Sequence, residues 1–118
     1  MIRLEKSEFD RRNCTYIKHD ENLKYNAPHT FMVLNAETNE PIQCIHFQKG
    51  PIKECGINGV SNEDLLNMVK CRLEHFQDSK FNCTENEKAI AHINAALECL
   101  YQRTNKREIR GVLGTSNA

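Results

Sequence analysis

The sequence has no tryptophan, few aromatic residues and no excess charge of either sign, since 16 lysine and arginine residues balance 16 aspartate and glutamate residues. This composition differs from that of a general nucleic-acid coat protein, which carries a broad basic surface. We therefore expect no DNA or RNA partner, and we expect any anion-binding site to be local. At 118 residues, the chain has room for one domain or for one domain with an appendage, and self-association would add burial.

Long apolar runs are also missing. The first residues, MIRLEKSEFDRRN, contain no apolar signal core, and no later run approaches the length that spans a membrane. The six cysteines include no C-x-x-C pair and the five histidines no H-x-x-x-H pair, so the common zinc spacings are absent. These absences predict a cytoplasmic protein with reduced thiols, no membrane partner, no metal site and no cofactor.

Turn-forming residues divide the first half of the chain into short segments. Residues 1–27 are polar and mixed, and they predict either a short helix or an irregular arm. Two β-prone runs, residues 30–34 and 42–47, flank the turn-rich sequence NAETNEP and predict a β-hairpin. Glycine, proline and an Asn-Gly pair then punctuate residues 48–60, which predict one more short extended piece.

Two amphipathic helices are predicted in the second half. Ser61 and Asp64, and then Thr84 and Glu87, have the three-residue spacing of a capping box. After each start, apolar residues recur every three or four positions. The two seams are Leu66, Val69, Leu73 and Phe76, and then Ile90, Ile93, Leu97 and Leu100. Because a short connection joins them, the helices should fold back antiparallel.

The fold prediction combines these segments. We predict an α+β protein with a small antiparallel sheet or hairpin in residues 1–60 and a two-helix hairpin in residues 61–118. The second helix is rich in alanine, which lets another helix approach closely. The helical hairpin is therefore expected to mediate oligomerisation.

The loop end of the helical hairpin carries an aromatic ring and an amide. Phe76 closes the first apolar seam, and Asn86 is the position reached when the second seam is continued backwards. An aromatic face beside an amide suits a nucleobase. The competing interpretation is that Phe76 belongs to the core and that Asn86 supports the helix cap.

The opposite end carries arginines. Arg103, Arg107 and Arg110 share one helix face, and Gly111 is a candidate C-cap. Planar guanidinium groups suit phosphate, although cations at a helix C-terminus also stabilise the helix dipole. At about 1.5 Å per residue, Arg107 lies roughly 30 Å from Asn86, so the two groups predict two separate sites.

Several stretches closely resemble the hairpin shared by two phage anti-defence families. The stretches are FQKGPIKECGINGVSNEDLL, RLEHFQ, KFNCTENEKA and ALECLYQRTNKREIRGVLGT, and the resemblance covers residues 46–115. The families are the Thoeris anti-defence sponges and the anti-CBASS cyclic-nucleotide sponges. The sequence NAPHTFMVLNAETNEPIQCIHF resembles the β-rich N-terminal part of the first Thoeris anti-defence type, whereas the anti-CBASS sponge is largely helical.

The resemblance implies a viral protein that sequesters cyclic ADP-ribose isomers, the glycocyclic forms made by TIR-domain enzymes, in the bacterial host cytoplasm. It also implies a homodimer or homohexamer with a second site for cyclic di- and trinucleotides. Phe76 of HFQ and Asn86 of TEN match the cyclic ADP-ribose pocket. Arg103 and Arg107 of RTNKR match the positions used for cyclic oligonucleotides, and Arg110 extends the same face.

Three further positions have no firm family counterpart or depart from the family. Lys49 and Lys53 of QKGPIKE are candidates for pyrophosphate contacts in the cyclic ADP-ribose site. Where many relatives have an acid, in RGVEGT, this chain has Leu113.

A nucleotide-degrading enzyme and a protein-binding regulator are the alternatives. Hydrolysis generally needs a metal cluster, a placed carboxylate pair or an activated nucleophile. Glu85 and Glu87 face different sides of a helix, and neither an acid nor a cysteine stands in clear relation to His75 and His92. We therefore assign no catalytic residue and expect capture of a ligand without turnover.

Overall fold

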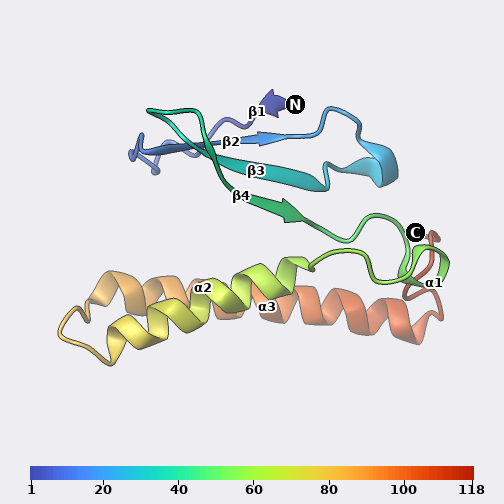
Figure 1. Cartoon of the computed structure of the whole chain (residues 1–118). Helices are drawn as coiled ribbons and strands as arrows, with labels where there is room; N and C mark the ends of the chain where they lie inside the picture. The colour runs from blue at the N-terminus through green and yellow to red at the C-terminus, as the bar shows by residue number, and fades with distance from the viewer. The chain divides into compact units, whose positions relative to one another are not determined.

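The computed structural model describes all 118 residues, which form two compact units, Met1–Val60 and Ser61–Ala118 (Figure 1). The first unit contains a β-sheet, and the second contains two long helices. The predicted α+β class, with the sheet before the helices, is confirmed. The sheet and the helical hairpin each lie within one unit.

Four antiparallel strands form the sheet in the order β1-β2-β3-β4. They span Ile2–Arg3 (β1), Thr15–His19 (β2), Thr30–Asn35 (β3) and Pro41–His46 (β4). Strands β3 and β4 are the predicted β-hairpin. The side-chain oxygen of Asn35 accepts hydrogen bonds from the backbone N–H groups of Glu37 (2.8 Å) and Thr38 (3.1 Å). The last side chain of β3 therefore stabilises the turn that leads to β4.

The core of the sheet is small. Tyr16 in β2 and Leu34 in β3 are cross-strand partners, and they are the buried apolar side chains of the chain. The Tyr16 hydroxyl donates a hydrogen bond to the side-chain oxygen of Asn39 (2.8 Å), which satisfies its polar end. Phe31 and Phe47 meet edge to face at a centroid distance of 5.4 Å. Because side chains alternate along a strand, Phe31 lies on the opposite face of β3 from Leu34.

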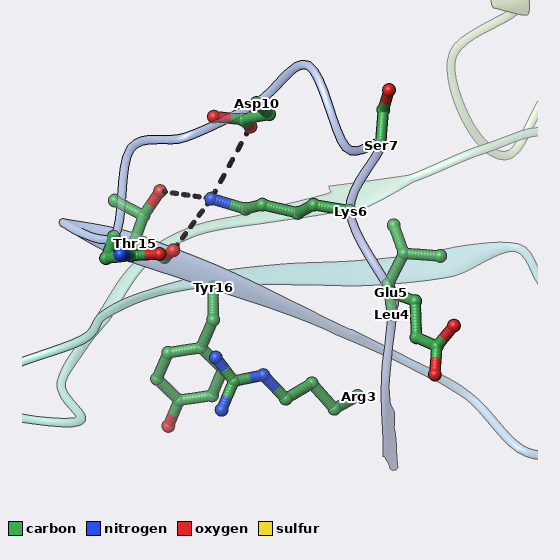
Figure 2. Close-up of a pocket in the computed structure, with 9 residues that line it drawn as sticks. Arg3, Leu4, Glu5, Lys6, Ser7, Asp10, Thr15 and Tyr16 are labelled. Carbon is green, nitrogen blue, oxygen red and sulfur yellow. Dashed lines mark hydrogen bonds and ion pairs between the residues drawn. The ribbon is translucent and has the colours of Figure 1, made fainter.

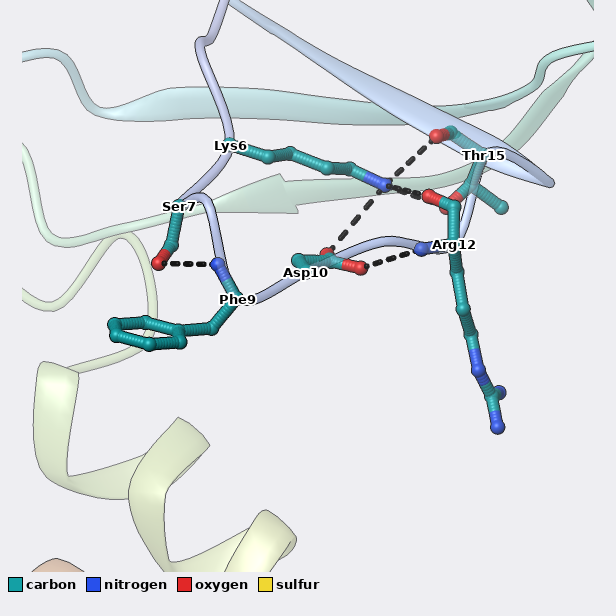
Figure 3. Close-up of polar contacts among 6 residues, drawn as sticks. All are labelled: Lys6, Ser7, Phe9, Asp10, Arg12 and Thr15. Atoms are coloured by element: carbon teal, nitrogen blue, oxygen red, sulfur yellow. Dashed lines mark hydrogen bonds and ion pairs between the residues drawn. The ribbon is translucent and has the colours of Figure 1, made fainter.

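The prediction for residues 1–27 missed two strands, because β1 and β2 both lie there. The segment that joins them is irregular and is held by Lys6. The Lys6 ammonium donates hydrogen bonds to the backbone and side-chain oxygens of Thr15 (2.8 and 3.4 Å). It also forms an ion pair with Asp10 (3.6 Å), so that one lysine joins the segment to β2 (Figure 3).

The segment after β4 differs from the prediction of a short extended piece. It contains a single helical turn, α1 (Ile52–Cys55), which begins directly after Pro51. Only an isolated parallel bridge between Phe47 and Val60 is extended. Gly59 makes this bridge possible, because a Cβ atom at this position would collide with the backbone carbonyl of Phe47.

Two helices, α2 (Asn62–Gln77) and α3 (Thr84–Ile109), make up most of the second unit and run antiparallel (Figure 1). The first predicted capping box is confirmed. The Ser61 hydroxyl accepts from the backbone N–H of Asp64 (3.0 Å), and the Asp64 carboxylate accepts from the N–H of Ser61 (2.9 Å).

The second predicted capping box is wrong. The N-cap of α3 is Cys83, Thr84 is already helical, and no side chain caps this start. Instead, the Gln77 side-chain amide donates to the carbonyl of Cys83 (3.0 Å) and accepts from its N–H (3.0 Å). This amide clamp across the connection fixes the start of α3.

The hairpin buries little of its apolar surface. Leu73 and Ile93 are half-buried, and no side chain of either helix is fully covered. Val69, which belongs to the predicted seam, is exposed, as are Met68 and Tyr101. One copy of the chain therefore leaves apolar side chains of the hairpin in contact with water. None of the helices combines the length and apolar character that crossing a membrane requires.

Candidate functional site

A hollow of about 470 Å³ lies at the loop end of the helical hairpin. Its lining residues come from the last turns of α2 and from the connection that follows. They are Arg72, His75, Phe76, Ser79 and Phe81. We call this group the tip hollow. Of these residues, the sequence identified only Phe76.

Hydrogen bonds within the connection place Phe81 beside α2. The Ser79 hydroxyl donates to the carbonyl oxygen of Phe76 (2.6 Å) and accepts from the backbone N–H of Phe81 (3.1 Å). The side chain of Asn82 then donates to the carbonyl of Ser79 (2.8 Å). A short polar loop thereby fixes two aromatic residues at one site.

A cationic side chain lies over each aromatic ring of the tip hollow. The Arg72 guanidinium lies 5.3 Å from the centroid of the Phe76 ring, and the Lys80 ammonium lies 5.3 Å from that of Phe81. Neither cation forms an ion pair with a carboxylate. Phe76 is 37% exposed and Phe81 63%, so both rings offer surface to a ligand. Flat apolar rings beside unpaired positive charge suit a nucleobase that is linked to phosphate.

Asn86 lies in the first turn of α3 and is half-buried. Its side chain makes no hydrogen bond within the chain, and α3 has no side-chain cap, which disfavours the cap-support interpretation. Asn86 is not among the residues that line the tip hollow with Phe76. Its amide therefore keeps both donors and its acceptor available.

Lys49 and Lys53 belong to the first unit, and both are exposed. The backbone of Lys49 is held by Asn58, whose side chain accepts from the Lys49 N–H (2.8 Å) and donates to its carbonyl (2.8 Å). Lys53 lies on α1. The tip hollow is lined without either lysine.

A second hollow, of about 530 Å³, lies along the last turns of α3. Its lining gathers the three arginines that the sequence placed on one face, and it adds a lysine. The lining residues are Cys99, Gln102, Arg103, Lys106, Arg107, Arg110 and Ala118. We call this group the basic hollow. Lys106 was not among the predicted residues, although its spacing of three from Arg103 was a usable signal.

Three of the four cations in the basic hollow are free of partners. Arg103, Lys106 and Arg110 are exposed, and no carboxylate lies within ion-pair distance of them. Like charges held together in this way attract an anion, because a bound phosphate removes their mutual repulsion. Arg107 differs, because it is half-buried and its guanidinium donates to backbone carbonyls of the chain.

The C-cap of α3 is Arg110, and Gly111, the predicted C-cap, is the residue directly after it. Gly111 follows the helix with a φ of 73°, the left-handed conformation that glycine adopts without strain. Its N–H donates to the carbonyl of Glu108 (3.0 Å), and the N–H of Val112 donates to that of Arg107 (3.0 Å). This pair of bonds is a Schellman motif, and it turns the chain back at the helix end.

A third hollow, of about 530 Å³, lies in the first unit between the N-terminal segment and β2 (Figure 2). Arg3 lies 4.6 Å from the centroid of the Tyr16 ring. Lys6, the central cation, is already engaged by Thr15 and Asp10. The lining also includes Glu5, so its charge is mixed. This hollow is a weaker candidate for an anion than the two hollows of the helical hairpin.

Comparisons with known proteins bear on both ends of the hairpin. The sequence pattern of the family described as "Acb2/Tad1, hairpin domain" matches residues 41–104, a range that contains the whole tip hollow and Arg103. The chain is also similar to "Thoeris anti-defense 1" of Bacillus phage SBSphiJ7. The two are 40% identical over an alignment 128 residues long. The alignment includes 89% of this chain and 90% of the relative.

Proposed function

The chain belongs to the Acb2/Tad1 family of hairpin proteins, which includes Thoeris anti-defense 1, and from this premise we propose its function. The chain is a phage anti-defence protein that acts by binding a small signalling molecule. Kinship along nearly the whole chain supports this function. Two hollows with cationic linings supply places where an anionic signal can bind.

The signal at the tip hollow is a cyclic ADP-ribose isomer of the glycocyclic kind made by TIR-domain enzymes. Such a ligand presents an adenine ring and a pyrophosphate. Phe76 and Phe81 supply ring surfaces for the base, and the unpaired guanidinium of Arg72 supplies a partner for the pyrophosphate. The combination of two exposed rings and an unpaired cation in one hollow is the observation that carries this proposal.

Asn86 is a further hairpin residue of the proposed cyclic ADP-ribose site, and Lys49 and Lys53 are separate candidates for contacts with the same ligand. Asn86 forms hydrogen bonds with a polar edge of the ligand, since its side-chain amide has no partner within the chain. Lys49 and Lys53 contribute pyrophosphate contacts through their exposed ammonium groups. These two lysines belong to the first unit, so their role is tested separately from that of the hairpin residues.

The basic hollow binds cyclic di- and trinucleotides of the CBASS type. Arg103 and Arg110 are unpaired, and Arg107 joins them once its guanidinium is released from the chain. Lys106 is a fourth phosphate contact. Replacing Arg103 by alanine should weaken cyclic dinucleotide binding and leave cyclic ADP-ribose binding unchanged, and replacing Asn86 should do the reverse.

The protein captures its ligand rather than cutting it. Capture works by mass action, so it needs a protein concentration above that of the signal and a low dissociation constant; nanomolar affinity corresponds to about 12 kcal/mol. His75 lines the tip hollow without a carboxylate or a cysteine beside it in that lining. A hydrolase site generally needs an activated nucleophile, a metal cluster or a pair of carboxylates.

An incubation and release experiment separates capture from catalysis. The protein is incubated with a cyclic ADP-ribose isomer, freed of unbound ligand and denatured, and the released compound is identified by mass spectrometry. Recovery of the intact cyclic compound supports capture. Recovery of linear ADP-ribose identifies an enzyme, and absence of any bound compound favours the alternative of a protein-binding regulator.

Self-association into a homodimer or a homohexamer is part of the proposal. The helices leave Met68, Val69 and Tyr101 exposed, and a second copy packed on the hairpin would cover such side chains. Size-exclusion chromatography with light scattering measures the mass directly, and a mass of one chain would contradict this proposal. We place the site of action in the cytoplasm of the bacterial host, where the signal is made.

A further inference from the structure

The guanidinium of Arg107 is occupied by the chain that follows α3. Its Nη2 atom donates to the backbone carbonyls of Val112 (3.1 Å), Thr115 (3.3 Å) and Asn117 (3.0 Å). Its Nη1 atom donates to the carbonyl of Ala118 (3.3 Å). Four oxygens therefore surround one guanidinium. We call residues 112–118 the tail.

Turn geometry holds the tail in this position. Gly111 and Gly114 both have positive φ, 73° and 76°, and they turn the chain back towards the end of α3. The N–H of Thr115 donates to the carbonyl of Val112 (3.1 Å) and closes a tight turn within the tail. The carbonyls thus converge on Arg107, although Asn117 and Ala118 are themselves exposed.

The contact with the tail leaves fewer N–H donors of Arg107 available to a phosphate. A guanidinium has five N–H donors, two of them on Nη2, and the tail shares the Nη2 donors among three acceptors. A phosphate that approaches Arg107 side by side needs the same donors for a bidentate contact. By contrast, Arg103, Lys106 and Arg110 have no partner, so they are ready to bind an anion.

We propose that the tail gates the basic hollow, with its carbonyls occupying Arg107 in the free protein and yielding the guanidinium to a phosphate of a cyclic oligonucleotide. This inference rests on the proposed function of the basic hollow. Ala118, a tail residue, lines that hollow directly, so the tail lies where the ligand binds. The tail therefore lowers the affinity for cyclic oligonucleotides and has no effect at the tip hollow.

A shortened chain that lacks Asn117 and Ala118, and whose new end at Ser116 is amidated so that no carboxylate is added, loses two of the four acceptors of Arg107 and keeps every cation of the basic hollow. Titration calorimetry with 3′,3′-cyclic GMP–AMP should show about tenfold tighter binding than the full chain, because a net hydrogen bond to a charged group is equivalent to roughly one order of magnitude. Binding of cyclic ADP-ribose should stay the same in both forms, which confirms that the hairpin is intact.

A pair of glycine substitutions provides a matched control. Gly114→Ala strains the tail, since alanine is disfavoured at φ 76°, and Gly56→Ala introduces alanine at another positive φ, 72°, in the first unit. A Cβ atom at Gly56 meets no neighbouring atom, so this variant carries the backbone cost alone. Gly114→Ala should tighten cyclic GMP–AMP binding, and Gly56→Ala should not.

Hydrogen exchange distinguishes a tail that is displaced by the ligand from a tail that stays in place. If the ligand displaces the tail, the Thr115 amide should exchange faster in the presence of cyclic GMP–AMP; slower exchange would mean that the tail closes over the ligand and would overturn the gate. Equal affinities for the full and shortened chains would also overturn it. If neither form binds cyclic GMP–AMP, the basic hollow is not such a site and both proposals fall.

Discussion

Replacing Phe81 by alanine should weaken cyclic ADP-ribose binding and leave the fold nearly as stable as before. Phe81 is 63% exposed, so most of its surface is already in water. Full burial of a phenylalanine side chain is worth about 1.5–3 kcal/mol, so the stability loss should stay near 1 kcal/mol or below it. Removing a ring that stacks on a base costs about 1–3 kcal/mol, which is a 5- to 150-fold loss of affinity.

Titration calorimetry with the 2′- and 3′-linked isomers of cyclic ADP-ribose measures the affinity, and urea unfolding followed by circular dichroism measures the stability. Phe9→Ala is the matched control, since Phe9 is also an exposed phenylalanine, at 87%, but lies in the first unit. Figure 3 shows its ring directed away from the contacts of Lys6, so its removal should spare that cluster.

The two variants should differ in affinity and agree in stability. If Phe81→Ala binds both isomers as tightly as Phe9→Ala does, the ring of Phe81 does not contact the ligand. The tip hollow would then lose one of the two surfaces on which the proposed base contact rests. If Phe81→Ala instead unfolds at a much lower urea concentration, the connection depends on this ring more than its exposure indicates.

Three other expectations concern stability. Ser61→Ala should lower the free energy of unfolding by about 0.5–2 kcal/mol in urea titrations, because the capping box is lost. Gly59→Ala should destabilise the first unit, because its Cβ atom would collide with the Phe47 carbonyl, and a thermal melt should show it. Partial desolvation would raise the pKa of Asp20, but hydrogen bonds from the Thr30 and His29 amides outweigh it and lower this pKa. Asp20 therefore stabilises the fold above the unfolded-state pKa, and this contribution should be lost on acidification through the folded-state pKa, a dependence that Asp20→Asn removes in acid titrations.

The helical hairpin could be predicted because its signals are local. Apolar residues at spacings of three and four, and the Ser61 capping box, depend only on neighbours along the chain. The same local pattern at Thr84 gave a wrong prediction of a capping box, because the hydrogen bonds of Gln77 to Cys83 determine where α3 begins. Strand β2 was missed because its five residues alternate weakly between polar and apolar types.

The candidate sites were predictable in part for the same reason. The arginines of the basic hollow share a helix face, so spacing alone placed them together. Phe81 was overlooked, although an aromatic residue in a polar loop was an available signal. The contacts of Arg107 with the tail depend on the path that two left-handed glycines impose on the backbone, which residue spacing does not describe.

We propose that the tip hollow holds the ring of a cyclic ADP-ribose isomer without cutting it. A crystal structure of the protein grown with such an isomer would show whether and how the ligand binds there. We expect an intact ligand whose adenine lies against Phe76 and Phe81 and whose pyrophosphate contacts Arg72. An empty tip hollow, or a ligand bound only elsewhere on the chain, would contradict it.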